Sequence, residues 1–164
     1  MVLPTWHLYY NSSMKKTKQD SGDGLAKLEH VFVYGTLKQG ECRELCWPRV
    51  ALNIESAWTL GALIDLGPYP ALLVGCDRVL GELWSFDPQD IAIVFEHLDR
   101  IEGTNQPGMP NEYDRVCVRV TCQTHGEVSA STYRYADLRR VAQFTSLAAS
   151  HAIDGQAYVR WPVQ

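Results

Sequence analysis

The sequence predicts an α+β fold in which helices pack against a mainly antiparallel sheet that is closed or strongly curved. Two observations support this fold class. Short runs of β-forming residues recur along the chain and are separated by turn residues such as Gly and Pro. Between them lies one segment with strong helical periodicity, at residues 87–103. A length of 164 residues suffices for about one domain with a substantial core.

The start of the chain differs in composition from the rest. Residues 11–24, NSSMKKTKQDSGDG, are polar and lack periodicity, as is typical of a mobile segment. We therefore expect a flexible leader over residues 1–29 and a folded domain over residues 30–164.

The charge balance and the first ten residues indicate which classes of partner and which cellular compartment to expect. The 15 Lys and Arg against 19 Asp and Glu give a net charge of −4, and no segment gathers the basic side chains that nucleic acid requires. Residues 1–10 lack the basic start of a signal sequence and are too short to span a bilayer. We expect a cytoplasmic protein with neither a nucleic-acid nor a membrane partner.

The cysteines favour reduced thiols. Their number, 5, is odd, and no secretory signal accompanies them, so a disulfide framework is not expected. Cys42 and Cys46 lie four residues apart on an expected helix, but no nearby pair of His or Cys residues completes a tetrahedral metal site. We therefore expect no metal.

The stretch VFVYGTLKQG, residues 31–40, begins with four bulky β-forming residues and then meets a glycine. Because residues 31–34 show no polar alternation, they predict a strand that is buried on both faces. Gly35 lets the backbone turn or approach another group closely, and the amides of Thr36 and Leu37 could then face a ligand. Alternatively, the sequence TLKQ fits a capping pattern and only starts a helical turn.

The next segment is expected to hold a short helix and three strands. Apolar residues at Cys42, Leu45 and Cys46 have helical spacing, and Pro48 ends that helix. Strands are predicted at residues 58–66, 69–74 and 79–86. The last two should pair as a hairpin around a turn at residues 75–77.

The strongest helical signal follows. Asp87 can cap a helix that has Pro88 in its first position, and Gly103 is placed to end it. The apolar residues form one stripe along this helix: Ile91, Val94, Phe95, Leu98 and Ile101.

One carboxylate lies within this stripe. At about 100° per residue, Glu102 falls about 20° from Ile91, whereas Glu96 is about 140° away and Asp99 about 80° away. An inward carboxylate loses hydration and lies at the negative end of the helix dipole, and both effects raise its pKa. These are the conditions for a general base that works near neutral pH. The alternative is a Glu in a frayed last turn that bends out to water.

Two further strands are predicted at residues 113–122 and 128–135, paired around a turn at His125 and Gly126. The first alternates, so that valines occupy one face and charged or polar residues the other. In the second, Tyr133 and Tyr135 lie on the same side. The chain should end with a helix at residues 138–151 and a short strand at residues 157–161.

Five motifs then form a recognisable set: VYGTLKQG at 33–40, GPYPALL at 67–73, GELWSFD at 81–87, LDRIEG at 98–103 and YDRVCVRV at 113–120. In this order they resemble the γ-glutamylcyclotransferase-like family, most closely its γ-glutamylamine cyclotransferase branch and small bacterial relatives. The resemblance covers about residues 31–136. It implies a small, mainly antiparallel β-barrel with flanking helices.

The resemblance implies an acyltransferase-type enzyme that acts on γ-glutamyl amines or peptides. The α-amine of such a substrate attacks its own γ-carbonyl, which gives 5-oxoproline and a free amine without a cofactor. The catalytic base of the family corresponds to Glu102, the residue that the helical periodicity singles out. The implied substrate-binding residues are Tyr34, Gly35, Thr36 and Leu37 in a loop and Tyr113 beside it.

Two positions bear on how far the resemblance extends. Glu82 fits the GE pattern of the family, but its carboxylate in a strand could equally be structural, so we leave it out of the site. Many relatives have Ser where this chain has Thr36; because the amine-directed branch also has Thr, this difference concerns substrate choice more than activity.

Two other classes of function fit part of the sequence. The same fold could serve as a non-catalytic binding or interaction module, which an inward Glu102 disfavours. A cysteine nucleophile is a further alternative, although no local Cys/His signature supports it. Its candidates are Cys42, Cys46 or Cys117, with His97 or His125 as the base. The sequence leaves the released amine and the oligomeric state open.

Overall fold

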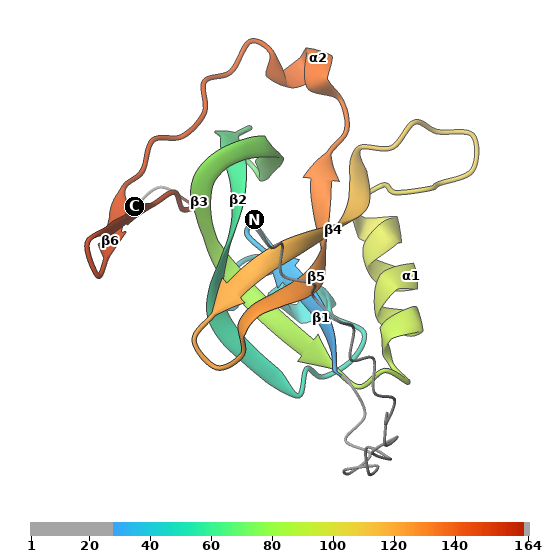
Figure 1. Cartoon of the computed structure of the whole chain (residues 1–164). Coiled ribbons are helices and arrows are strands. Elements are labelled where there is room, and N and C mark those ends of the chain that lie inside the picture. Colours follow the sequence, from blue (N-terminus) through green and yellow to red (C-terminus); the bar gives the residue numbers. More distant parts are fainter. Residues whose placement is uncertain (1–27, 163–164) are drawn as a thin grey trace, which may run out of the picture.

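Five strands close into a barrel in the computed structural model, which describes residues 28–162 (Figure 1). They are β1 Glu29–Val33, β2 Asn53–Asp65, β3 Pro70–Phe86, β4 Tyr113–Cys122 and β5 Gly126–Tyr135. Around the barrel the order is β1-β3-β2-β4-β5, and all neighbours are antiparallel except the parallel pair β1 and β5. The predicted fold class is confirmed. Residues 1–27 of the expected leader lie outside the described residues.

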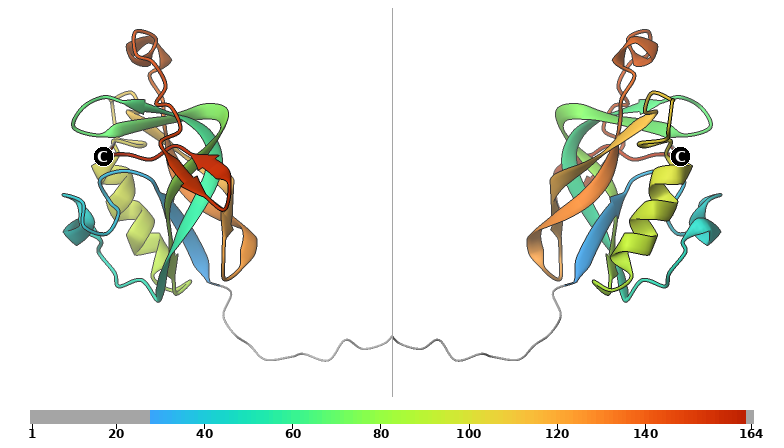
Figure 2. Two further views of the ribbon diagram at one scale, coloured as in Figure 1. Left: turned by 90° about the vertical axis from the view of Figure 1, so that its left-hand side faces the viewer. Right: turned by 90° about the vertical axis from the view of Figure 1, so that its right-hand side faces the viewer.

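The remaining elements lie around this barrel. Helix α1, Ile91–Ile101, runs along one side, and the hairpin of β6, His151–Ile153, and β7, Gln156–Tyr158, lies on another side (Figures 1 and 2). Two short helical segments complete the set, η1 at Glu44–Cys46 and α2 at Leu138–Val141. Within residues 28–162 no helix is long and apolar enough to cross a membrane.

Strand β1 is buried on both faces, as its sequence predicts. Val31 and Val33 pack in a core that includes the apolar stripe of α1, whereas Phe32 and Tyr34 join a second core formed mainly by the other strands. Each of the four is at most 6% exposed. A strand between two cores has a fixed position, and it carries the loop that follows it to the same end of the barrel as the last turn of α1.

The hairpin expected within residues 69–86 is wrong. This segment is one continuous strand, β3, and both of its halves pair with β2. The register shifts where Gly61 pairs with Asp77 and Ala62 with Leu73, so residues 74–76 form a bulge instead of a turn. A Cβ atom at Gly75 would lie 2.5 Å from the amide nitrogen of Ala62, so this glycine permits a close approach of the two backbones.

Two expected helices are largely absent for a common reason. The helix predicted at residues 41–47 is only the three-residue η1, and Leu45 in it is 96% exposed. The helix predicted at residues 138–151 ends at Val141, and Phe144 beyond it is 41% exposed. Helical spacing without a surface to cover does not hold a short helix in water. The strand predicted at residues 157–161 is the shorter β7, after which Val159 forms a parallel bridge with Val79.

Helix α1 has the predicted stripe and the predicted end, but it begins later than expected. Asp87 accepts a hydrogen bond from the backbone N–H of Gln89 at 2.8 Å and so forms a turn before the helix. The first helical residue is Ile91, preceded by Asp90 at the N-cap position. At the other end Gly103 has φ +62, a conformation that favours glycine, and it terminates the helix.

Candidate active site

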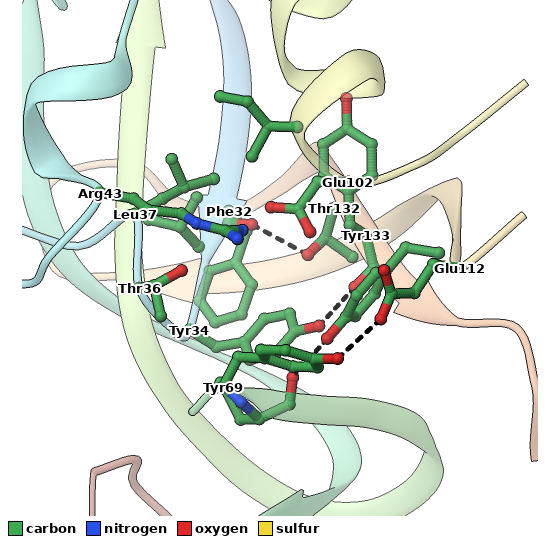
Figure 3. Close-up of a pocket in the computed structure, with 15 residues that line it drawn as sticks. Phe32, Tyr34, Thr36, Leu37, Arg43, Tyr69, Glu102, Glu112, Thr132 and Tyr133 are labelled. Carbon is green, nitrogen blue, oxygen red and sulfur yellow. Dashed lines mark hydrogen bonds between the residues drawn. The ribbon is translucent and has the colours of Figure 1, made fainter. Parts of the chain in front are cut away.

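A pocket opens where the loop after β1 meets the end of α1 and the starts of β3 and β4 (Figure 3). Its lining contains all six residues that the sequence analysis assigned to a site: Tyr34, Gly35, Thr36, Leu37, Glu102 and Tyr113. These residues come from three separate segments of the chain. The structure brings them together, and the role of each remains a prediction.

The loop after β1 is a turn and not the start of a helix. The backbone N–H of Lys38 donates to the carbonyl of Gly35 at 3.2 Å, and no helix follows before Glu44. The helix-capping interpretation of TLKQ is therefore wrong. A Cβ atom at Gly35 would lie 2.9 Å from Cγ of Pro70, so the close approach that this glycine permits is made by a proline that itself lines the pocket.

Hydrogen bonds from Lys38 and Gln39 hold this loop in place. The ammonium of Lys38, a residue that is only 5% exposed, donates to the carbonyl of Trp161 at 2.5 Å. The backbone N–H of Gln39 donates to Oε2 of Glu82 at 3.0 Å, and that oxygen also accepts from the indole of Trp84 at 2.9 Å. Glu82 is not among the pocket-lining residues, so its contacts are those of a structural group that ties the loop to β3.

Glu102 is the C-cap residue of α1, and its backbone N–H donates to the carbonyl of Leu98 at 2.8 Å. Its carboxylate points into the pocket, as the helical periodicity predicts, and does not bend out to water (Figure 3). Burial raises the pKa of this carboxyl group to about 7. The guanidinium of Arg43 lowers that pKa, and the carboxylate of Glu112 raises it. Glu102 can therefore both accept and return a proton near neutral pH.

Tyrosines whose hydroxyls are already engaged form much of the wall. Tyr34 donates to the carbonyl of Tyr133 at 2.6 Å, and Tyr113 donates to the carbonyl of Pro70 at 2.8 Å. Burial raises the pKa of both phenols, and the nearby carboxylate of Glu102 adds to the increase. These phenols therefore stay neutral, and they fix the shape of the pocket.

The polar pocket residues that sequence reasoning missed include Arg43, Tyr69 and Glu112. Tyr69 donates to Oε1 of Glu112 at 2.8 Å, and the backbone N–H of Glu112 donates to the carbonyl of Gly103 at 3.1 Å (Figure 3). Tyr69 lies within the GPYPALL motif, and Glu112 directly precedes Tyr113 in the sequence, so adjacency could have suggested both.

No local pattern singles out Arg43, because it lies within residues 41–47, whose apolar spacing predicts a short helix. Its backbone N–H donates to the carbonyl of Thr36 at 2.9 Å, which ties it to the loop after β1. Among the described residues its guanidinium forms no hydrogen bond or close ion pair, and it reaches into the pocket toward Glu102 (Figure 3). It offers a cation with free donors to an anionic group of a ligand.

The cysteine alternatives find no support in this geometry. Neither Cys42, Cys46 nor Cys117 is among the residues that line the pocket, and Cys117 is exposed on β4. Within residues 28–162 the thiol near His125 belongs to Cys122, at 4.0 Å. The groups that the pocket offers thus include two carboxyl groups, a guanidinium, backbone amides and neutral phenols.

Comparisons with known proteins agree with this fold. Residues 31–158 match the family described as "Gamma-glutamyl cyclotransferase, AIG2-like". A relative from Niallia circulans, gamma-L-glutamyl-butirosin B gamma-glutamyl cyclotransferase, is 30% identical over 110 residues, which are 66% of this chain and 67% of the relative.

Two solved structures share the fold. One is the solution structure of a protein from Arabidopsis thaliana. It is 26% identical in sequence, has a TM-score of 0.51, and the match covers 72% of this chain and 74% of that one. An AIG2-like protein from Mus musculus is 22% identical with a TM-score of 0.51, over 84% of this chain and 99% of that one. The matched family span, residues 31–158, contains every residue of the pocket described above.

Proposed function

The chain belongs to the gamma-glutamyl cyclotransferase, AIG2-like family, and on this premise we propose that it converts γ-glutamyl amines or peptides to 5-oxoproline and a free amine. The observation that carries the proposal is Glu102, a carboxyl group with a pKa of about 7 that points into the pocket. A group of this pKa can take a proton from an ammonium and give it to a leaving nitrogen at neutral pH. The relative from Niallia circulans, named for the same kind of reaction, supports the proposal.

The proposed reaction is intramolecular. Glu102 removes a proton from the α-ammonium of the substrate, and the resulting amine attacks the γ-carbonyl to close a five-membered ring. The C–N bond to the leaving amine then breaks as Glu102 gives its proton to the departing nitrogen. The ring nitrogen loses its second proton to Glu102, which passes it to the released amine, so that the products are 5-oxoproline with a neutral ring nitrogen and an ammonium. Because nucleophile and electrophile belong to one molecule, the enzyme needs only to hold the substrate in the attacking geometry, which can lower the barrier by several kcal/mol.

Two groups of the pocket are proposed to hold the substrate. Arg43, whose guanidinium is without a close partner among the described residues, pairs with the α-carboxylate. The backbone amides of the loop from Gly35 to Leu37 then stabilise the oxyanion that develops on the γ-carbonyl. The fixed contacts of Lys38 and Glu82 keep this loop rigid, which such stabilisation requires.

The test uses the full chain and three substrates: a γ-glutamyl amide, the same amide acetylated on its α-nitrogen, and an α-linked glutamyl amide. The products are identified by mass spectrometry. We expect 5-oxoproline from the first compound alone, because the second has lost its nucleophile and the third does not present the required geometry. Release of acetyl-glutamate from the blocked compound would show a hydrolase that uses water, and binding of the first compound without turnover would show a non-catalytic module.

A further inference from the structure

A second cluster of reactive side chains lies at the end of the barrel opposite the pocket. It consists of Glu55 on β2, Cys122 at the last position of β4 and His125 in the turn that follows. Tyr113, the first residue of β4, lines the pocket, so the two places are separated by the whole length of that strand (Figure 1). The proposed reaction uses none of the three residues.

Their donor atoms converge on one point. The carboxylate oxygen of Glu55, the Sγ of Cys122 and a ring nitrogen of His125 all lie within 4.8 Å of one another. Oε1 of Glu55 is 2.9 Å from Nδ1 of His125, and Sγ of Cys122 is 4.0 Å from the same nitrogen. Bonds of 2.0–2.3 Å to a tetrahedral zinc ion give distances of about 3.3–3.8 Å between ligand atoms, so small side-chain shifts would fit this set around one ion.

The convergence does not suit a thiol nucleophile. In a catalytic triad the thiol and the carboxylate contact opposite nitrogens of the imidazole, so that one nitrogen takes the proton while the other is held. Here both contact Nδ1. Burial and the nearby carboxylate of Glu55 also raise the pKa of the Cys122 thiol, which keeps it protonated.

The three side chains are partly fixed by their surroundings and remain partly accessible to solvent. Oε2 of Glu55 accepts the backbone N–H of Thr124 at 3.1 Å, so one oxygen is fixed by the turn while the other faces His125. Cys122 is 7% exposed. The side chains of Glu55 and His125 are 12% and 36% exposed, which leaves one side accessible for entry of an ion and a bound water.

We propose that Glu55, Cys122 and His125 bind a divalent transition-metal ion of the zinc class. Thiolate, imidazole and carboxylate together are ligands that Zn²⁺ accepts, whereas Mg²⁺ and Ca²⁺ prefer oxygen alone. Binding replaces the thiol proton by the metal and moves the imidazole proton from Nδ1 to Nε2. One proton is therefore released per ion bound.

The experiment titrates the full chain, first freed of metal with a chelator, with Zn²⁺ and separately with Co²⁺. We expect one ion per chain, release of one proton, and a thiolate-to-cobalt charge-transfer band. Cys122→Ser should remove the band, and Cys122→Ser, Glu55→Gln and His125→Gln should each weaken zinc binding by about 100-fold or more. The matched controls are Cys117→Ser on the same strand and His151→Gln, which should bind as the unaltered chain does.

Thermal melting without metal separates loss of a ligand from loss of the fold. His125→Gln, in an exposed turn, should melt as the unaltered chain does, and only its zinc-dependent increase in Tm should disappear. The proposal is overturned if the unaltered chain binds no zinc at micromolar concentration. It is equally overturned if the band survives in Cys122→Ser and disappears in Cys117→Ser.

Discussion

At the residue scale, the proposed chemistry depends on one carboxylate and on the charges around it. Glu102 reaches the pocket because α1 ends there, and its pKa is set by burial, by Arg43 and by Glu112. Burial and Glu112 favour the protonated form, whereas Arg43 favours the charged form. The result is a pKa of about 7, near which proton transfer in both directions is efficient.

The first prediction removes this group. Glu102→Gln keeps the volume of the side chain but cannot accept a proton, so we expect turnover of a γ-glutamyl amide to fall by about 100-fold or more. The melting temperature should stay the same or rise, because a half-buried ionisable group has been removed. Glu96→Gln is the matched control, since Glu96 lies on the same helix and its side chain is 74% exposed. Unchanged turnover in Glu102→Gln would show that the base is another group.

The second prediction concerns pH. Because Glu102 must be deprotonated to accept the substrate proton, kcat/KM should fall as the pH decreases through about 7. Arg43→Met removes the cation that lowers the pKa of Glu102, so the acid limb of the profile should move to higher pH. The KM should rise as well if Arg43 binds the α-carboxylate.

The control for this measurement is Arg139→Met, which changes the net charge equally on an exposed side of α2. A profile that shifts equally in both variants would reflect net charge alone. A profile of Arg43→Met that stays in place would mean that another group sets the acid limb.

At the element scale, the site depends on how the loop after β1 is held against β3. Gly35 lies under Pro70, the first residue of β3, and Lys38 and Gln39 tie the loop to more distant segments. The amides proposed to stabilise the oxyanion therefore belong to a segment with little freedom. Such rigidity favours electrostatic stabilisation, because no reorganisation is needed during the reaction.

The third prediction tests this contact. Gly35→Ala would place a Cβ atom 2.9 Å from Cγ of Pro70, so we expect a loss of about 1–3 kcal/mol in the free energy of unfolding and a fall in kcat/KM. Adding Pro70→Ala removes the opposing ring atoms and should restore part of both losses. Denaturant unfolding and steady-state kinetics of the single and double variants measure this coupling. Strictly additive losses would show that the contact does not position the loop.

At the scale of the whole molecule, the candidate active site and the proposed metal site lie at opposite ends of the closed barrel. Strand β4 begins at the pocket with Tyr113 and ends at the Glu55, Cys122 and His125 cluster. Among the described residues, 28–162, each site is formed by the barrel, its loops and the end of α1. We therefore predict that the domain assigned to residues 30–164 carries the proposed activity by itself.

The fourth prediction follows from that assignment. A shortened chain that begins at Leu28 should fold and should release 5-oxoproline at a rate within about twofold of the full chain, because residues 28–162 contain two packed cores and the closed barrel. Circular dichroism and the mass-spectrometric assay measure both properties. A shortened chain that does not fold, or that folds without turnover, would place part of the domain within the first 27 residues.

Local patterns in the sequence were enough to predict several features of the structure. The apolar run at residues 31–34 determined a strand buried on both faces, and the 3.6-residue period of α1 directed Glu102 inward. Alternation over residues 113–122, followed by a turn and a second β-forming run, determined the β4–β5 pair. Each of these signals lies within one element or two elements joined by a short turn, where backbone geometry relates spacing to direction.

Other features were decided only by contacts between distant segments. The sequence predicts a turn at residues 75–77, yet β2 is long enough to pair with both sides of this segment, so residues 74–76 form a bulge within one continuous strand. Leu45 and Phe144 remain exposed, so the two helices predicted around them lack a continuous buried face and are short. Arg43 entered the pocket, and Glu55 met Cys122 across 67 positions, because the barrel closed. A sequence pattern specifies which face of an element is apolar, but the partner of that face is determined by packing of the whole chain.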